Sequence, residues 1–250
     1  MNNRNWYEPY ITSWGTEAPS QFSEALARTI PIEAGRTRLL DIGCGSGIIG
    51  IYCLIEKKSQ SVTFTDIAPI WIDIARSNVD LKVHEGLIDP SRTKFLEPTE
   101  LASIPYDEVA QHDLVSFNPP QLPYAYVDEA TRQKIDSDPI ERSFRRGGES
   151  GLEIVSMFFT WYASLPMPKP DAVILLSSFL GRRNIENAMS ISGLTPRDAP
   201  IESNATLRSM FWEYAERFSN SPSEMTDRSI RKVNGVWHKK LLTYRLTNQR

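Results

Sequence analysis

The stretch RLLDIGCGSGIIGIYCL, from Arg38 to Leu54, is an apolar run that breaks into glycines and then resumes. This pattern predicts a buried strand, a tight turn and a helix. Gly43, Gly45 and Gly47 fall in the turn, where a side chain would keep a ligand from the helix N-terminus and where positive φ angles are often needed. We therefore expect the turn to bind a nucleotide-like ligand that contains adenosine.

Two acidic residues accompany the turn. The β-rich run SVTFT, residues 61–65, ends in Asp66, about 20 residues beyond the glycines. An acidic residue at the end of the second strand of an open α/β sheet accepts hydrogen bonds from the two hydroxyls of a ribose. Asp66 also has the position of a helix N-cap, and the two roles are compatible. Asp41, inside the glycine run, and Ile67, which follows Asp66, are further expected cofactor contacts.

A third apolar run indicates which of the cofactors that bind to such a turn this chain uses. Residues 113–117 lead directly into Asn118, Pro119 and Pro120. Together, the segment DIGCGSG, the acidic Asp66 and the segment FNPP resemble class I S-adenosylmethionine (SAM)-dependent methyltransferases, in the branch that has an Asn/Asp-Pro-Pro-Tyr/Phe/Trp tetrapeptide. The resemblance implies SAM as the cofactor, and a nicotinamide enzyme has no use for this tetrapeptide.

Two further segments narrow the resemblance. Arg146 to Glu153, RGGESGLE, is similar to the GG-x-x-GL segment of the HemK/PrmC family of glutamine N-methyltransferases, and Gly15-Thr16-Glu17 is similar to the Thr-Glu before the core of that family. The resemblance runs from about Thr16 to Leu180. It implies an α/β fold, namely a Rossmann-like, seven-stranded class I methyltransferase sheet with helices on both faces and a short N-terminal cap.

The tetrapeptide also implies the catalytic residues. In the enzymes of this branch, the Asn side-chain oxygen and the carbonyl of the first Pro accept the N–H groups of a flat amide or amine, so that its nitrogen lone pair faces the methyl group of SAM. Proline suits the loop because it fixes φ and donates no hydrogen bond. The resemblance therefore assigns catalytic roles to Asn118 and Pro119, and it also places Asn118 at the cofactor.

The fourth residue of the motif departs from the family. Gln121 stands where Tyr, Phe or Trp would stack on a planar substrate, an interaction worth about 1–3 kcal/mol. The acceptor is then either not planar or stacked by another residue, such as Tyr124 or Tyr126. A Pro-Gln sequence followed by a G-x-GL segment is also similar to plant methionine S-methyltransferases, which act on a free amino acid. Only about 35 residues precede the core, so we expect no helical domain that recognises a release factor.

The small amino-acid-like acceptor that this departure favours has several candidate contacts. Aromatic rings near the N-terminus either line its pocket, facing a sulfonium through cation–π contacts, or pack the N-terminal cap on the core. Arg145 and Arg146 either hold a substrate carboxylate or are solvated loop charges. The expected substrate contacts are Tyr7, Tyr10, Trp14, Gln121, Tyr124 and Arg146.

Length and charge agree with a single enzyme domain. The chain has 250 residues, 40% of them hydrophobic, and a net charge of −3 that does not attract it to nucleic acid or anionic lipid. No segment reaches the roughly 20 apolar residues of a membrane span, and the N-terminus lacks a signal-peptide core. We expect a cytoplasmic protein with a small-molecule substrate and with neither a membrane nor a nucleic-acid partner; the oligomeric state stays open.

The cysteines and histidines indicate neither a disulfide nor a metal site. Cys44 and Cys53 are expected to be reduced packing residues. His84, His112 and His238 do not have the spacing of metal ligands, and we expect no metal.

We expect an aromatic cap or lid at residues 1–35 and a SAM-binding core at residues 36–250, with an active-site loop at residues 121–149. Helical patterns cover residues 19–29, 47–57, 70–78, 151–165, 185–192 and 207–218. Strand patterns cover residues 39–42, 62–65, 93–96, 113–117, 172–179 and 236–246.

Three functions stay open. The first is methylation of a nitrogen, or of a sulfur, in a small amino-acid-like metabolite. The second is cyclisation of the aminobutyryl group of SAM to azetidine-2-carboxylate with release of methylthioadenosine, in which Asn118 would hold the amine of SAM. The third is a non-catalytic SAM-binding or RNA-associated protein. Methylation of a protein glutamine or of a nucleic-acid base is disfavoured.

Overall fold

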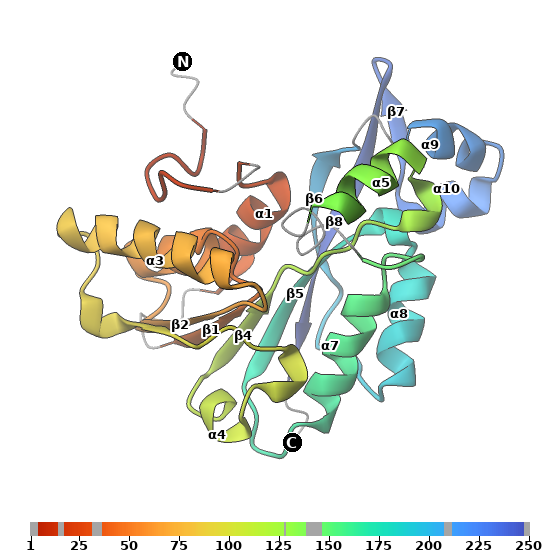
Figure 1. The fold of residues 1–250 in the computed structure, drawn as a ribbon. Helices are drawn as coiled ribbons and strands as arrows, with labels where there is room; N and C mark the ends of the chain where they lie inside the picture. Colours follow the sequence, from red (N-terminus) through yellow and green to blue (C-terminus); the bar gives the residue numbers. More distant parts are fainter. Residues whose placement is uncertain are drawn as a thin grey trace. The chain divides into compact units, whose positions relative to one another are not determined.

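The computed structural model describes residues 5–14, 18–31, 37–127, 129–138, 147–207 and 212–247. The chain divides into two compact units, which Figure 1 draws together. The first unit holds residues 1–118, 165–174 and 245–250, and the second holds residues 119–164 and 175–244. The expected division into a cap at residues 1–35 and a core stays a prediction.

The strands form one sheet. Seven of them are hydrogen-bonded in the order β3-β2-β1-β4-β5-β8-β6, and β7 pairs with β8. Pairing is parallel from β3 to β5 and antiparallel where β6 and β7 join β8. The strands are β1 (Arg38–Ile42), β2 (Ser61–Thr65), β3 (Thr93–Phe95), β4 (Leu114–Phe117), β5 (Asp171–Ser177), β6 (Ile201–Thr206), β7 (Arg231–Val233) and β8 (Val236–Leu246).

Helices alternate with the parallel strands. They are α1 (Gln21–Thr29), α2 (Ile48–Ile55), α3 (Pro69–His84), α4 (Tyr106–Val109), α5 (Glu129–Ser137), α7 (Glu153–Ser164), α8 (Arg182–Ile191), α9 (Trp212–Ser219) and α10 (Pro222–Arg228), with single 3-10 turns η1 (Pro90–Arg92), η2 (Leu101–Ser103), η3 (Tyr124–Tyr126) and η4 (Ser178–Leu180). None of the helices in the described ranges combines the length and apolarity needed to cross a bilayer. The predicted Rossmann-like α/β sheet is confirmed, with eight strands rather than seven among the described residues.

Several element predictions were incomplete or wrong. The helix predicted over 70–78 continues to His84. Of the helix predicted over 207–218, the structure describes Trp212–Ser219 as α9, whereas Leu207 lies outside α9 and donates its N–H to the Trp237 carbonyl. Residues 208–211 lie outside the described residues. Strands β6 and β7 and helix α10 were not predicted. The segment predicted as a loop over 121–149 contains η3 and α5, so it is not irregular throughout.

The core of the first unit is built on β1 and α2. All four residues of β1 after its first are buried, and so are the residues of α2 from Ile48 to Leu54. Helix α2 packs on β1 and β2, and α1 packs on α2. Cys44 and Cys53 are buried and free of disulfides, as predicted. A helix that is apolar on every face requires cover on every face, and α1 supplies part of that cover.

The second unit has a separate core around β8. Its buried members come from β8, η4, α9 and the residues that follow η3, β6 and α10, and half-buried aromatic and aliphatic side chains pack against them. The buried residues are Val127, Phe179, Leu207, Ala215, Ile230 and Trp237.

A buried lysine fastens α1 to the first unit. The Lys58 ammonium, 6% exposed, donates to the carbonyl oxygens of Ala27, Arg28 and Ile30 at distances of 3.0, 2.9 and 2.8 Å. These carbonyls lie at the C-terminal end of α1, where helix carbonyls lack partners within the helix. Burial lowers the pKa of Lys58, yet three carbonyl partners favour the charged form.

We expect Lys58→Met to lower the free energy of unfolding by about 2–3 kcal/mol, because three carbonyls lose their shared donor while the apolar stem is kept. Urea unfolding followed by circular dichroism measures the change. Lys57→Met is the matched control, since Lys57 is exposed, and it should change stability by less than about 0.5 kcal/mol. Equal losses in the two variants would contradict this role of Lys58.

Candidate cofactor and active site

The glycine turn joins the end of β1 to the start of α2. Gly43, Gly45 and Gly47 have φ angles of 60°, 53° and 78°, a region that favours glycine. A Cβ on Gly47 would lie 3.1 Å from the Cβ of Ala75 in α3, whereas a Cβ on Gly45 would meet no atom within 4 Å. Gly47 is therefore required for close helix packing, and Gly45 presents bare backbone to open space.

Asp66 follows β2 and ties it to the turn. Its two carboxylate oxygens accept from the Gly45 N–H at 3.0 Å and from the Ala68 N–H at 3.1 Å, respectively. The residue is 8% exposed, and burial raises the pKa of its carboxyl group. Each oxygen keeps lone-pair capacity for a further donor. The next residue, Ile67, is 57% exposed, an apolar surface beside this carboxylate.

Asn118 lies beside the glycine turn in the sheet. Ile42 and Phe117 are register partners in the β1–β4 pair, so the residues after them, Gly43 and Asn118, leave the sheet side by side. A Cβ on Gly43 would lie 3.3 Å from the Phe117 ring. The Asn118 amide nitrogen lies 3.4 Å from the Ser23 hydroxyl of α1, which leaves the Asn118 side-chain oxygen as the acceptor. Ser23 was not predicted as a site residue.

Asp41 lies underneath the turn. Its carboxylate, with no exposed surface, accepts from the Ser116 hydroxyl of β4 at 2.7 Å and from the Gly50 N–H of α2 at 3.2 Å. Burial raises the pKa of Asp41 from 3.8 to about 7, in spite of the two hydrogen bonds. Asp41 thus links β1, β4 and the first turn of α2, and its predicted contact with the cofactor stays a prediction.

A buried asparagine fastens the N-terminal segment to the turn. Asn78 of α3, 1% exposed, accepts from the N–H groups of Thr12 and Ser13 and donates to the carbonyls of Ser13 and Ser46, at 2.6 and 2.9 Å. Because Ser46 belongs to the glycine turn, this one side chain connects α3, the turn and the N-terminal segment. Sequence reasoning missed Asn78.

The N-terminal aromatic residues pack against one another and against α2. The rings of Tyr7 and Trp14 meet edge to face with centroids 5.3 Å apart, and those of Tyr10 and Tyr52 with centroids 5.0 Å apart. The Tyr10 hydroxyl donates to Glu56 at 2.7 Å, just beyond the C-terminal end of α2. Burial raises the pKa of Tyr10. These rings therefore pack against one another and against α2, and substrate contact by Tyr7, Tyr10 and Trp14 stays a prediction.

In the second unit, the segment after Pro119 runs along the predicted G-x-GL segment. The N–H groups of Tyr124 and Ala125 donate to the carbonyls of Gly148 and Glu149 at 2.9 and 3.0 Å. A Cβ on Gly147 would lie 2.7 Å from the Gln121 Cα, so this position requires glycine. Arg145, Arg146 and the Thr16–Glu17 motif lie outside the described residues.

The side chains of Gln121 and Tyr124 are both engaged within the second unit. The Gln121 amide nitrogen donates to the Leu175 carbonyl at 3.0 Å, and its amide oxygen accepts from the Ser177 N–H at 2.6 Å. Tyr124 is 5% exposed, and its hydroxyl lies 3.3 Å from the Asp136 carboxylate. Contacts of these two residues with a substrate stay predictions.

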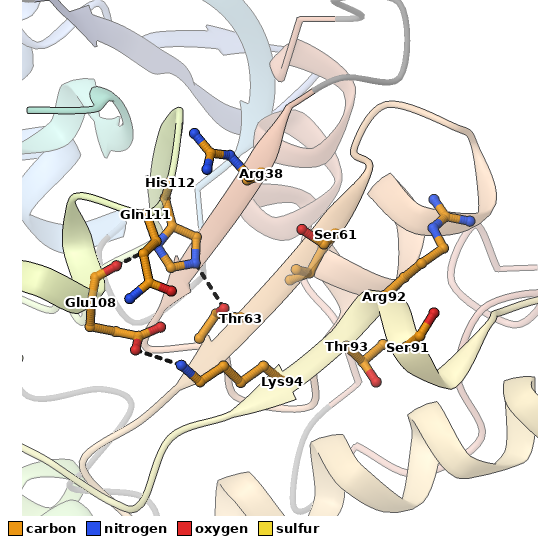
Figure 2. A pocket seen from close by; sticks show the side chains of 11 residues that line it. Arg38, Ser61, Thr63, Ser91, Arg92, Thr93, Lys94, Glu108, Gln111 and His112 are labelled. Atoms are coloured by element: carbon orange, nitrogen blue, oxygen red, sulfur yellow. Dashed lines mark hydrogen bonds and ion pairs between the residues drawn. The ribbon is translucent and has the colours of Figure 1, made fainter.

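A separate cavity of about 250 Å³ lies at the opposite ends of the strands, beside the first residues of β1, β2 and β3 (Figure 2). Lys94 lies 2.5 Å from Glu108, and a dashed line joins the two in Figure 2. Arg38 lies 2.8 Å from Asp113, and Arg92 donates to backbone carbonyls, among them that of Ser59. The His112 ring bonds to the Thr63 hydroxyl at 2.8 Å, and burial lowers the pKa of the ring. Ligands of open α/β sheets bind at the carboxyl ends of the strands, so this cavity is not the candidate site.

No group of three His, Cys, Asp or Glu side chains that could hold a metal ion occurs in the described part of the chain.

The family model "Methyltransferase small domain" matches residues 19–149. The chain is 30% identical over 105 residues to a release factor glutamine methyltransferase of Leptospira interrogans, covering 42% of this chain and 35% of that protein. It is 30% identical over 112 residues to ribosomal RNA large subunit methyltransferase G of Klebsiella pneumoniae, covering 44% of this chain and 28% of that protein. The chain thus spans well under half of each relative.

A solved structure agrees in fold over nearly the whole chain. The precorrin-6y C5,15-methyltransferase of Geobacter metallireducens superposes with a TM-score of 0.51 at 11% identity, covering 96% of this chain and 95% of that one.

The raised pKa of Asp41 predicts a pH-dependent stability. The unfolded chain releases this proton near 3.8, whereas the folded protein keeps it to about 7. Over that interval ionisation favours the unfolded state, so the free energy of unfolding falls as the pH rises. Asp41→Asn removes the titration. The stability of the wild type relative to Asp41→Asn should therefore fall by at least about 1 kcal/mol between about pH 5 and pH 8.

Urea unfolding at each pH measures this difference. Asp80→Asn is the matched control, because Asp80 is exposed on α3 and its replacement changes the net charge equally. The same pH dependence in both comparisons would contradict the buried state of Asp41.

Proposed function

The chain belongs to the methyltransferase small domain family, and from this membership we propose that it transfers the methyl group of SAM to a nitrogen of a small amino-acid-like acceptor. It is a class I, SAM-dependent transferase by family. The observation that carries the proposal is the register of β1 and β4, in which Asn118 leaves the sheet beside the glycine turn. Cofactor and acceptor nitrogen would then meet at neighbouring strand ends.

The residues around the turn fit SAM. Gly45 offers a backbone face with no atom of the described residues within 4 Å of a Cβ position, which leaves room there for a ligand. The Asp66 carboxylate accepts from the N–H groups of Gly45 and Ala68, and its oxygens have lone pairs left for the hydroxyls of a ribose. The exposed side chain of Ile67 supplies an apolar surface next to it for the adenine. Gly43, Gly47 and Asp41 would support this site by shaping and holding the turn.

For methyl transfer, the protein mainly has to align the acceptor nitrogen with the methyl group of SAM. When bound, SAM supplies a methyl group on a sulfonium, which is already an activated leaving group. The Asn118 oxygen and the Pro119 carbonyl would accept N–H groups of the acceptor and orient the nitrogen lone pair, a contribution of positioning. The Ser23 hydroxyl supports this role, because it engages the Asn118 amide nitrogen and leaves the oxygen available.

The acceptor class rests on the fourth motif residue. Gln121 has no ring to stack on a planar group, and its amide is bonded to β5. The named relatives act on release factors and ribosomal RNA, but their similarity covers only 42% and 44% of this chain and less of their own length. A net charge of −3 also disfavours a nucleic-acid substrate. We therefore keep a small, amino-acid-like acceptor, with residues 1–35 as the proposed cap of the first unit.

One observation favours a second reaction on the same site. Because Gln121 cannot stack on a planar acceptor, an aliphatic amine is the better nucleophile, and SAM contains one. In that reaction the amine nitrogen of the aminobutyryl group of SAM bonds to the γ carbon of the same group. The bond from that carbon to sulfur breaks, and the amine releases a proton. The products are azetidine-2-carboxylate and methylthioadenosine, and Asn118 would hold the amine.

Two substitutions test whether Asp66 binds the cofactor and Asn118 positions the acceptor. Asp66→Ala should weaken binding of S-adenosylhomocysteine at least about tenfold, because it removes a charged acceptor of the ribose hydroxyls. Asn118→Ala should leave that affinity within about twofold and abolish turnover. Isothermal calorimetry and product release measure the two effects, and Asp73→Ala, at an exposed site of α3, is the control. Wild-type turnover in Asn118→Ala would remove Asn118 from the mechanism.

Product analysis separates the two reactions. We expect purified protein given SAM and a mixture of the twenty free amino acids to release S-adenosylhomocysteine and to place labelled methyl in a small molecule. Methylthioadenosine from SAM alone would show cyclisation instead. Mass spectrometry distinguishes the products, and release of neither would contradict both reactions.

A further inference from the structure

We propose that the Gln121 side chain takes the place of the Pro119 peptide group in the β4–β5 ladder, which frees and orients the Pro119 carbonyl for the acceptor. Gln121 is then a positioning residue that acts through Pro119 rather than a substrate contact. The inference rests on the proposed function, and it revises the predicted role of Gln121.

The register of β4 and β5 shows which backbone hydrogen bond of their ladder cannot form. Phe117 pairs with Ile174, and the Asp171 N–H donates to the Asp113 carbonyl at 3.1 Å. In a parallel ladder every second residue of one strand bonds to the two residues that flank its partner on the neighbouring strand. Asp171 is such a residue of β5, and so are Val173, Leu175 and Ser177. Two repeats beyond Asp171, the Leu175 carbonyl therefore comes opposite the nitrogen of Pro119.

Proline cannot make that bond. Its nitrogen carries no hydrogen, so the Leu175 carbonyl would be left without a donor. In the same register, the Ser177 N–H comes opposite the Pro119 carbonyl, and an ordinary ladder would use that carbonyl for Ser177. A buried peptide group without a partner costs about 1–3 kcal/mol, so both groups of β5 need substitutes.

Gln121 supplies both substitutes. Its amide nitrogen donates to the Leu175 carbonyl at 3.0 Å, and its amide oxygen accepts from the Ser177 N–H at 2.6 Å. A primary amide has two hydrogens and a carbonyl oxygen, so one side chain reproduces the donor and acceptor of a peptide. Ser177 is thereby satisfied without the Pro119 carbonyl.

The same side chain also holds the freed carbonyl. The Gln121 amide nitrogen lies 3.4 Å from the Pro119 oxygen, within reach of its second hydrogen. The oxygen keeps a lone pair for an acceptor N–H. The backbone of Gln121 is fixed from the other side, since a Cβ on Gly147 would lie 2.7 Å from its Cα and a Cβ on Gly151 would lie 2.9 Å from its carbonyl oxygen.

The arrangement has a consequence for the substrate. An aromatic residue at position 121 could stack on a planar amide but could not bond to Leu175 and Ser177. Gln121 cannot stack on a planar amide, but its side-chain nitrogen and oxygen both bond to the protein backbone. The acceptor class that fits is an amine nitrogen held by carbonyl oxygens alone, as in a free amino acid or in SAM itself.

The test compares Gln121→Met with Gln133→Met. Methionine keeps the length of glutamine without its hydrogen bonds, and Gln133 is an exposed glutamine on α5. We expect Gln121→Met to speed amide hydrogen exchange of Ser177 at least tenfold by NMR. It should also slow product release from SAM plus the twenty amino acids at least tenfold, with affinity for S-adenosylhomocysteine within twofold. Gln133→Met should change none of the three.

A second variant, Gln121→Glu, is tested by the pH dependence of its turnover, which a loss of packing alone would not change. In Gln121→Glu a neutral carboxylic acid can donate to Leu175, whereas the carboxylate cannot. Its turnover relative to the wild type should therefore rise as the pH is lowered from 8 to 5.5, because only the bond to the Leu175 carbonyl needs the added proton. A flat ratio across that range would contradict the proposal.

The outcomes separate this inference from the proposed function. Wild-type protein that releases no product from SAM contradicts the proposed function, whatever Ser177 does. Unchanged Ser177 exchange in Gln121→Met contradicts the role of Gln121, and so does wild-type turnover in that variant.

Discussion

The buried carboxylate of Asp41 is the constraint on which the first unit depends. With no exposed surface, it holds the hydroxyl of Ser116 in β4 and the Gly50 N–H of α2 at once. The glycine turn lies between these two attachments, and Asp66 holds it from the end of β2 through Gly45. Two buried acids therefore give a segment with three positive φ angles a single conformation, which a site that binds through backbone needs.

The elements around the turn are fastened by side chains that bond to backbone. Lys58 holds the end of α1, which brings Ser23 to Asn118, and Asn78 holds residues 12 and 13 to the turn. In the second unit the Gln121 side chain bonds to the Leu175 carbonyl and the Ser177 N–H of β5. Each of these side chains is satisfied by peptide groups rather than by other side chains, so the geometry of the candidate site follows the backbone closely.

The sequence predicted what local patterns determine. The apolar runs at β1, β2, β4 and β5 and the glycine turn between the first strand and α2 lie where they were expected. Strand β6 was missed because Ile201-Glu202-Ser203-Asn204 has no apolar alternation and pairs at an edge of the sheet. The sequence does carry a signal for β7, since the Asn234-Gly235 pair is typical of a two-residue hairpin, and both residues have positive φ angles in the structure.

The site was less predictable than the fold. Asp66 and Asn118 could be found because each directly follows a strand, but Ser23 and Asn78 act across 95 and 65 residues of sequence and belong to no motif. Gln121 was read as a substrate contact from its place in the motif. Its bonds to Leu175 and Ser177 depend on the strand register, which no local pattern contains.

A crystal structure with S-adenosylhomocysteine would test the central claim most directly. We expect the ribose hydroxyls within hydrogen-bonding distance of Asp66 and the sulfur facing the side-chain oxygen of Asn118. A nucleoside bound away from the glycine turn, or a sulfur turned away from Asn118, would contradict it.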